Sequence, residues 1–251
     1  MSDDSSKVVE KGVWGPFSAI GLTFLAFAGA QLFAVFLAGL WPALNGWPSE
    51  RANAWLDSIG TQFVFVLVSE ALIMGVLWLF MRRRHISWRS LGYNRRPQWR
   101  DLAYATLGFA VYFVLLIIVS NAVGSLTGID LDQKQELGFD NVFTDTQRLM
   151  AFISLVVLPP VVEETLFRGF LFGGLRRRLP FWWATLLTSI LFAAPHLLAS
   201  SEGLLWVAGL DTFILSLFLC YIREKTGSLW ACIGLHAIKN GFAFMLLFII
   251  T

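Results

Sequence analysis

Residues 150–175 read MAFISLVVLPPVVEETLFRGFLFGGL, a long apolar stretch that nevertheless contains three charged side chains. About 20 apolar residues in a helix suffice to cross a bilayer, so this segment predicts a membrane span. A charge at bilayer depth costs at least about 2.5–3.5 kcal/mol on insertion scales. Because spanning requires no such charges, Glu163, Glu164 and Arg168 indicate a functional site inside the membrane.

The whole chain has the composition of a membrane protein. Of its 251 residues, 57% are apolar and 14% are charged, whereas soluble domains carry about 25% charged residues. The apolar runs predict an all-α fold, a polytopic helical bundle of about seven transmembrane helices. The expected spans are residues 16–40, 59–81, 102–123, 149–175, 181–198, 204–222 and 228–250. We expect a disordered tail at 1–15 and a short interfacial helix within 41–58.

Basic residues gather at three junctions, namely 82–100, 176–178 and 223–225. These junctions follow the second, fourth and sixth expected spans, so all three lie on one side of the membrane. Cytosolic loops carry the excess of Lys and Arg, which predicts a cytoplasmic N-terminus and a C-terminus outside. The small size of the chain favours a bacterial plasma membrane.

The two adjacent acids have different expected surroundings. Glu164 and Arg168 lie four residues apart, on one helix face, and can form an ion pair. Glu163 is rotated by about 100° from Glu164 and has no such partner. Pro159 and Pro160 remove backbone donors and predict a kink just upstream. Backbone freed in this way is tolerated in a membrane only against protein or water, which favours a water-filled cavity at Glu163.

Two further spans carry histidines. His196 ends the sequence FAAPH in the fifth expected span, and His236 begins HAIKN in the seventh, so His236 and Asn240 share a helix face. Polar groups of this kind are costly in lipid and indicate function. A carboxylate and a histidine around one water form a general base, with His and Asn as oxyanion donors.

The same side chains suit metal chemistry as well. Glu163, His196 and His236 are possible ligands for zinc or another divalent metal that activates water. Spacing alone leaves both mechanisms open. We expect no cofactor, with a metal as the alternative.

Three motifs carry a resemblance to a known family. Glu163-Glu164-x-x-x-Arg168, Phe192-x-x-x-His196 and His236-x-x-x-Asn240, in this order, resemble the CAAX protease and bacteriocin-processing (CPBP or Abi) enzymes, also called type II CAAX prenyl endopeptidases. The resemblance covers roughly residues 147–250. It implies a catalytic core at 147–251, in the C-terminal four helices, preceded by a tail and three helices at 1–146.

The resemblance also implies an activity and roles for residues. The activity is intramembrane endopeptidase cleavage of hydrophobic peptides or of membrane-associated, possibly prenylated CAAX-type, proteins. Glu163 would be the general base, assisted by His196. His236 and Asn240 would stabilise the oxyanion, with Glu164 and Arg168 supporting the catalytic group. The expected partners are the lipid bilayer and a membrane-associated peptide or lipidated protein, with no nucleic acid; the oligomeric state stays open.

The chain departs from the family pattern at Lys239, where we expect a neutral residue, and at Ser216, which stands where glycine is frequent. Lys239 could pair with Asp211 or Glu70. We interpret these two acids as packing groups or as partners of the site residues.

Two other functions remain open from the sequence. A proton- or ion-coupled transporter would use the same series of Glu, His and Asp side chains to relay charge, although the sequence contains no inverted repeat. A non-catalytic, immunity-type membrane scaffold would keep the fold without the reaction.

Overall fold

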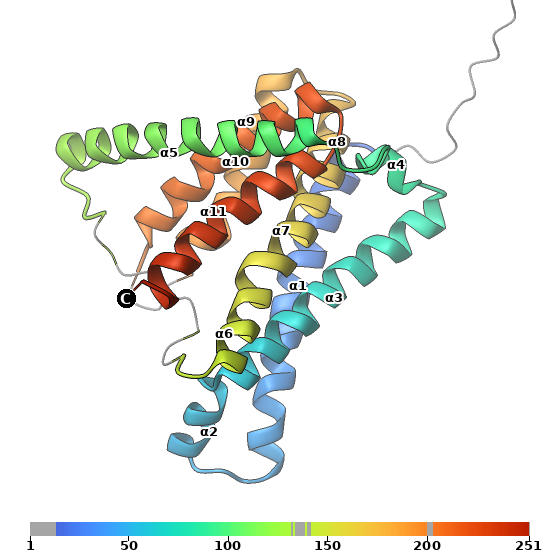
Figure 1. The fold of residues 1–251 in the computed structure, drawn as a ribbon. Helices are drawn as coiled ribbons and strands as arrows, with labels where there is room; N and C mark the ends of the chain where they lie inside the picture. The colour runs from blue at the N-terminus through green and yellow to red at the C-terminus, as the bar shows by residue number, and fades with distance from the viewer. Residues whose placement is uncertain (1–13, 132, 134–138, 140–141, 200–202, 251) are drawn as a thin grey trace, which may run out of the picture.

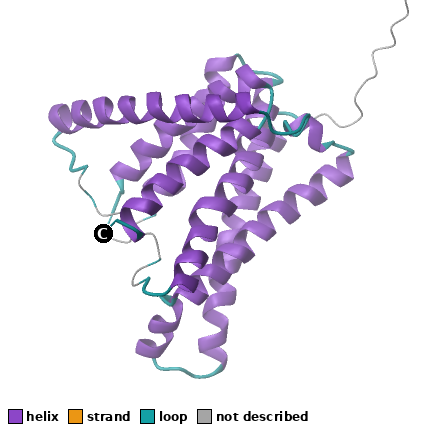
Figure 2. Cartoon of the chain, viewed as in Figure 1, coloured by secondary structure: helices purple, strands orange, loops and turns teal. Residues whose placement is uncertain are grey.

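The computed structural model describes residues 14–131, 133, 139, 142–199 and 203–250. The regular structure in this part of the chain is entirely helical (Figure 2), which confirms the predicted all-α class. Among the described residues, six helical runs are long and apolar enough to cross a membrane: α1 (Pro16–Leu44), α3 (Ile59–Arg84), α5 (Trp99–Thr127), the run Asp145–Arg176, α10 (Trp206–Thr226) and α11 (Trp230–Phe248). The chain is therefore a polytopic integral membrane protein.

The expected fifth span corresponds to α9 (Phe181–Leu197), which is shorter than the other spans. This apolar helix occupies the place of the expected fifth span but has only 17 residues. At 1.5 Å per residue it is about 25 Å long, shorter than the roughly 30 Å hydrocarbon core. The described residues thus contain six full-length candidates and this shorter apolar helix. Two short helices lie in connections, α2 (Ser49–Leu56) and α4 (Trp88–Leu91), and α2 confirms the short helix expected within 41–58.

The central run Asp145–Arg176 is an irregular helix. It consists of α6 (Asp145–Phe152), the π-helical segment η1 (Ile153–Val157), α7 (Leu158–Glu163), the π-helical segment η2 (Glu164–Leu171) and α8 (Phe172–Arg176). Proline has no N–H to donate, so Pro159 and Pro160 interrupt the regular ladder between η1 and α7. Segments of π-helix are rare and occur frequently at functional sites.

The central run is covered from two sides (Figure 1). One hydrophobic cluster joins its η2 and α8 segments to α1, α3 and α9, with buried Leu166, Phe167 and Phe170 among its members. A second cluster joins α5, α10 and α11. The run is thus held between the two groups of helices, which places its charged residues in the interior.

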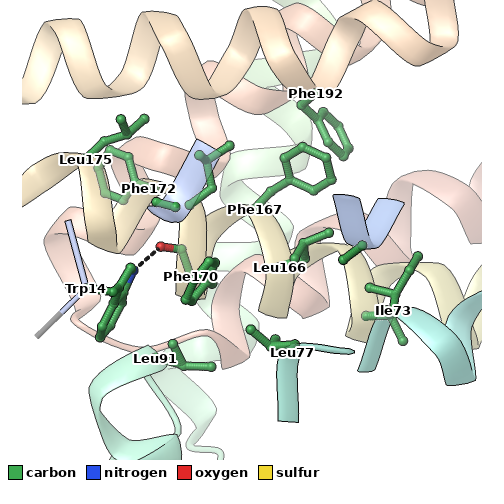
Figure 3. Close-up of a cluster of buried hydrophobic side chains, with 14 of the residues drawn as sticks. Trp14, Ile73, Leu77, Leu91, Leu166, Phe167, Phe170, Phe172, Leu175 and Phe192 are labelled. Atoms are coloured by element: carbon green, nitrogen blue, oxygen red, sulfur yellow. Dashed lines mark hydrogen bonds between the residues drawn. The ribbon is translucent and has the colours of Figure 1, made fainter. Parts of the chain in front are cut away.

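The start of the described chain is packed rather than disordered. Trp14 is only 2% exposed, its ring stacks on Phe170 at a centroid distance of 5.4 Å, and its Nε1 donates to the Phe170 carbonyl at 2.8 Å. Figure 3 shows this contact at the edge of the core cluster. The expected tail at 1–15 is therefore wrong for its last two residues, while 1–13 lie outside the described residues.

The Trp14 contact depends on a close approach at Gly174. A methyl group added there would lie 2.6 Å from Ala19 Cβ and 2.6 Å from Trp14 Nε1. Gly174 thus lets α8, α1 and Trp14 pack together.

Gly174→Ala is expected to lower the free energy of unfolding by about 1–3 kcal/mol, the usual cost of overpacking. Gly39→Ala in α1 is the matched control, because its added methyl meets no described atom within 4 Å. Unfolding of both variants in detergent would be followed by circular dichroism. Equal midpoints for the two variants would contradict the packing of Trp14 against Gly174.

Candidate active site

The predicted site residues surround one cavity of about 560 Å³. Its lining includes Glu163 at the end of α7, His196 near the end of α9, and both His236 and Asn240 of α11. Residues of α10 complete the wall. Three sequence motifs that lie up to 77 positions apart are therefore brought to one place by the packing of four helical segments.

Glu164 lies behind this cavity in a fully buried network. Arg168 Nη1 donates to Glu164 Oε1 at 3.0 Å, and both side chains are 0% exposed. The same carboxylate oxygen accepts from His236 Nδ1 at 2.9 Å. The guanidinium also lies over the Phe192 ring, 4.2 Å from its centroid. The expected ion pair is present, and it has the additional effect of orienting His236.

Glu163 faces a different direction from its neighbour. It lines the cavity, and its Oε2 lies 4.0 Å from His236 Nε2. The helical rotation of about 100° per residue separates the two carboxylates. His236 consequently stands between them, with Nδ1 toward Glu164 and Nε2 toward Glu163.

The tautomer of neutral His196 follows from its backbone partner. Its Nδ1 lies 2.9 Å from the Phe192 carbonyl oxygen. A carbonyl oxygen can only accept, so Nδ1 carries the proton and Nε2 keeps its lone pair. A histidine in this form can accept a proton or a hydrogen bond from a water molecule.

Asn240 is positioned by the two prolines. The Leu155 carbonyl would bond to residue 159 in an α-helix or to residue 160 in a π-helix, and both are proline, which lacks an N–H. Asn240 Nδ2 donates to this carbonyl at 2.8 Å. The amide thereby satisfies a backbone group that the central run leaves free, and its second N–H remains available for a ligand.

Lys239 forms a second ion pair in the cavity wall. Its Nζ lies 2.9 Å from Asp211 Oδ2 of α10, and the hydroxyl of Tyr112 in α5 donates to the other oxygen, Oδ1. Of the two partners expected for Lys239, the structure selects Asp211. Glu70 is buried in α3 and lies near enough to Glu163 to interact with it electrostatically.

Sequence reasoning missed two tyrosines near these groups. Tyr112 is one of them. The other is Tyr93, in the arginine-rich connection, whose hydroxyl lies 2.7 Å from Thr165 Oγ1, next to Glu164. Burial raises the pKa of Tyr93, so its hydroxyl stays protonated. Neither residue belongs to a motif, and each meets its partner across more than 70 positions of sequence.

The alternative metal site would draw on Glu163, His196 and His236. In the part of the chain that the structure describes, no three His, Cys, Asp or Glu residues are grouped as metal ligands. His236 Nδ1 is bonded to Glu164, which leaves Nε2 facing the cavity, the orientation in which a histidine commonly ligates a metal.

A comparison with protein families agrees with the motifs. Residues 145–242 match the family described as "Type II CAAX prenyl endopeptidase Rce1-like". This segment is Rce1-like. The match contains all three motifs and confirms the family resemblance expected from the sequence.

Two curated relatives of the chain come from bacteria. The chain is 31% identical over 157 residues to "Uncharacterized protein YyaK" of Bacillus subtilis (strain 168). This match covers 61% of the chain and 49% of the relative. The chain is also 33% identical over 90 residues to "Uncharacterized 24.3 kDa protein" of Escherichia coli, covering 35% and 40%. The chain thus spans about half the length or less of the curated relatives it matches. No solved structure matches it.

Asn240→Leu is expected to lower the free energy of unfolding by about 1–3 kcal/mol, because it leaves the part-buried Leu155 carbonyl without a donor. Asn121→Leu is the matched control: Asn121 also donates to a carbonyl, that of Ile117 in its own helix, but it is exposed on α5. Denaturant unfolding in detergent micelles would compare the two. Similar losses would contradict the special role of the carbonyl freed by the prolines.

Proposed function

We propose that this protein is an intramembrane endopeptidase that hydrolyses peptide bonds of hydrophobic peptides or of membrane-associated, lipidated proteins. The observation that carries the proposal is the cavity that gathers Glu163, His196, His236 and Asn240 within an Rce1-like segment. Isolated polar residues in a bundle have no reason to converge on one cavity, whereas hydrolysis requires a base and oxyanion donors together.

In the proposed reaction, the Glu163 carboxylate takes a proton from water while the water oxygen attacks the peptide carbonyl carbon. The carbonyl electron pair moves onto oxygen and forms a tetrahedral oxyanion. His196 Nε2, which carries the free lone pair, accepts from the second hydrogen of the water and orients it. When the intermediate collapses, the C–N bond breaks and Glu163 returns its proton to the leaving amine.

The oxyanion would be stabilised by Asn240 and His236. Asn240 uses its second amide hydrogen, since the first is bonded to Leu155. His236 can donate from Nε2 only when both ring nitrogens carry protons, so this role requires the imidazolium form, with its Nδ1–H bonded to the Glu164 carboxylate. Glu164 and Arg168 act through His236 as positioning residues.

We further propose how the chain is organised around this reaction. Residues 147–251 form the catalytic core, and the tail and first three helices at 1–146 support it. The protein lies in a bacterial plasma membrane with a cytoplasmic N-terminus, as the basic junctions after α3, α8 and α10 favour.

Glu163→Gln and His196→Gln are each expected to lower kcat/KM for a quenched fluorescent hydrophobic peptide by about 100-fold or more, the usual contribution of a general base. Purified protein in detergent would be assayed with plain and lipidated peptides. Glu50→Gln, an exposed acid on α2, is the control and should cleave at the wild-type rate.

Wild-type cleavage by both site variants would show that this mechanism is wrong. Peptide binding without cleavage by the wild type would favour the scaffold function. Proton flux into liposomes that Glu163→Gln abolishes would favour the transporter.

Chelation gives a separate test of the metal-free mechanism. Because the proposed base is a carboxylate and the proposed donors are His236 and Asn240, dialysis against EDTA or 1,10-phenanthroline is expected to leave the cleavage rate unchanged. A complete loss that added zinc restores would overturn the glutamate mechanism while leaving the endopeptidase activity in place.

A further inference from the structure

Lys239 is a cation in the wall of the proposed catalytic cavity that the reaction does not use. Among the described residues that line this cavity, it is the single lysine or arginine. A cation at this depth is costly and is by default functional. The notable feature is its side chain, which keeps 18% of its surface exposed in the cavity wall.

Three helices hold the Lys239 ammonium in place. Asp211 of α10 accepts from it, and Tyr112 of α5 occupies the other carboxylate oxygen. Both Asp211 oxygens are therefore used. The ammonium has three N–H donors, so two remain after the bond to Asp211. The arrangement fixes a cation at the cavity wall with donors to spare.

The position of Lys239 suits a ligand group near the reacting bond. It lies three residues after His236, on the same face of α11, and lines the same cavity as Glu163, His196 and His236. Its bond to Asp211 holds the ammonium next to α10, whereas the Glu163 carboxylate belongs to α7 of the central run. The cation and the proposed base are therefore carried by different helices of the cavity wall. Much of the remaining lining is apolar: Leu155, Pro159, Leu215, Ala243, Phe244 and Leu247.

We propose that Lys239 is the carboxylate-binding subsite of this cavity, which selects peptides that present an anion close to the cleaved bond. The anion is a carboxylate, supplied either by the free C-terminus or by an acidic side chain. The inference rests on the proposed endopeptidase function and deepens it by naming a substrate feature. A purely structural ion pair would not need to line the cavity, since a buried pair is often replaceable by apolar residues without loss of stability.

The test measures binding with Glu163→Gln protein, so that no peptide is consumed. Three fluorescent hydrophobic peptides of one sequence would be compared by anisotropy in detergent: a free acid, a C-terminal amide, and an amide with glutamate as its penultimate residue. At least one carboxylate form is expected to bind about 10- to 100-fold more tightly than the plain amide, the range of charge-assisted hydrogen bonds.

Variants assign this preference to the ammonium. Adding Lys239→Gln to the Glu163→Gln protein should remove the preference for the carboxylate peptides. Adding Lys239→Arg instead should keep most of that preference. Because Lys239→Gln leaves Asp211 without its cation, the pair Lys239→Gln with Asp211→Asn provides a neutral version that avoids an unpaired buried charge. Lys225→Gln, an exposed lysine at the end of α10, is the matched control and should bind like the parent.

The outcomes separate the two proposals. Preference for the free acid assigns a terminal carboxylate, and preference for the glutamate amide assigns a side chain; both support the subsite. Equal affinity for all three peptides, or a preference that survives Lys239→Gln, overturns it. Cleavage is measured separately on the wild type. A carboxylate preference in binding without any cleavage would sink the endopeptidase proposal and leave the subsite standing.

Discussion

The Glu164 carboxylate has no exposed surface and accepts hydrogen bonds from both Arg168 and His236. An ionised carboxylate in a membrane interior is costly unless it is paired and hydrogen-bonded. Arg168 meets this requirement from the same helix, and His236 meets it from α11. Satisfying one buried charge therefore also fixes where α11 docks on the central run and how the His236 ring is turned. Glu163, one position earlier, is left facing the cavity.

The prolines impose a second constraint on the same pair of elements. The Leu155 carbonyl loses its helical donors, and Asn240 supplies one from α11. His236 and Asn240 are one turn apart, so α11 is attached to the central run at two points, one on each side of α7. Leaving this part-buried carbonyl without a donor costs about 1–3 kcal/mol, so the bond helps to hold α11 on the central run. The proposed active site thus consists largely of groups that satisfy charges and backbone atoms of one irregular helix.

The local features of the site could be predicted from the sequence. Glu164 with Arg168, and His236 with Asn240, are four residues apart, and a helix brings such residues together whatever surrounds it. The interruption at Pro159 and Pro160 follows from the missing N–H groups. Within the described residues, hydropathy located every long span and also the short α9. The family resemblance added roles that spacing alone leaves open.

Contacts between helices could not be predicted in the same way. Trp14 on Phe170, Tyr112 on Asp211 and the choice of Asp211 over Glu70 all depend on how each helix is rotated about its axis. Helices such as α1 are apolar all round, and lipid provides no hydrophobic force that would turn one face inward. The sequence by itself determined that this protein is a helical membrane bundle with costly charges in its fourth span. Only the tertiary structure decided that His236 of α11 joins Glu164 and Arg168 and that Lys239 pairs with Asp211, because close packing and hydrogen bonding between helices set the rotation of each helix.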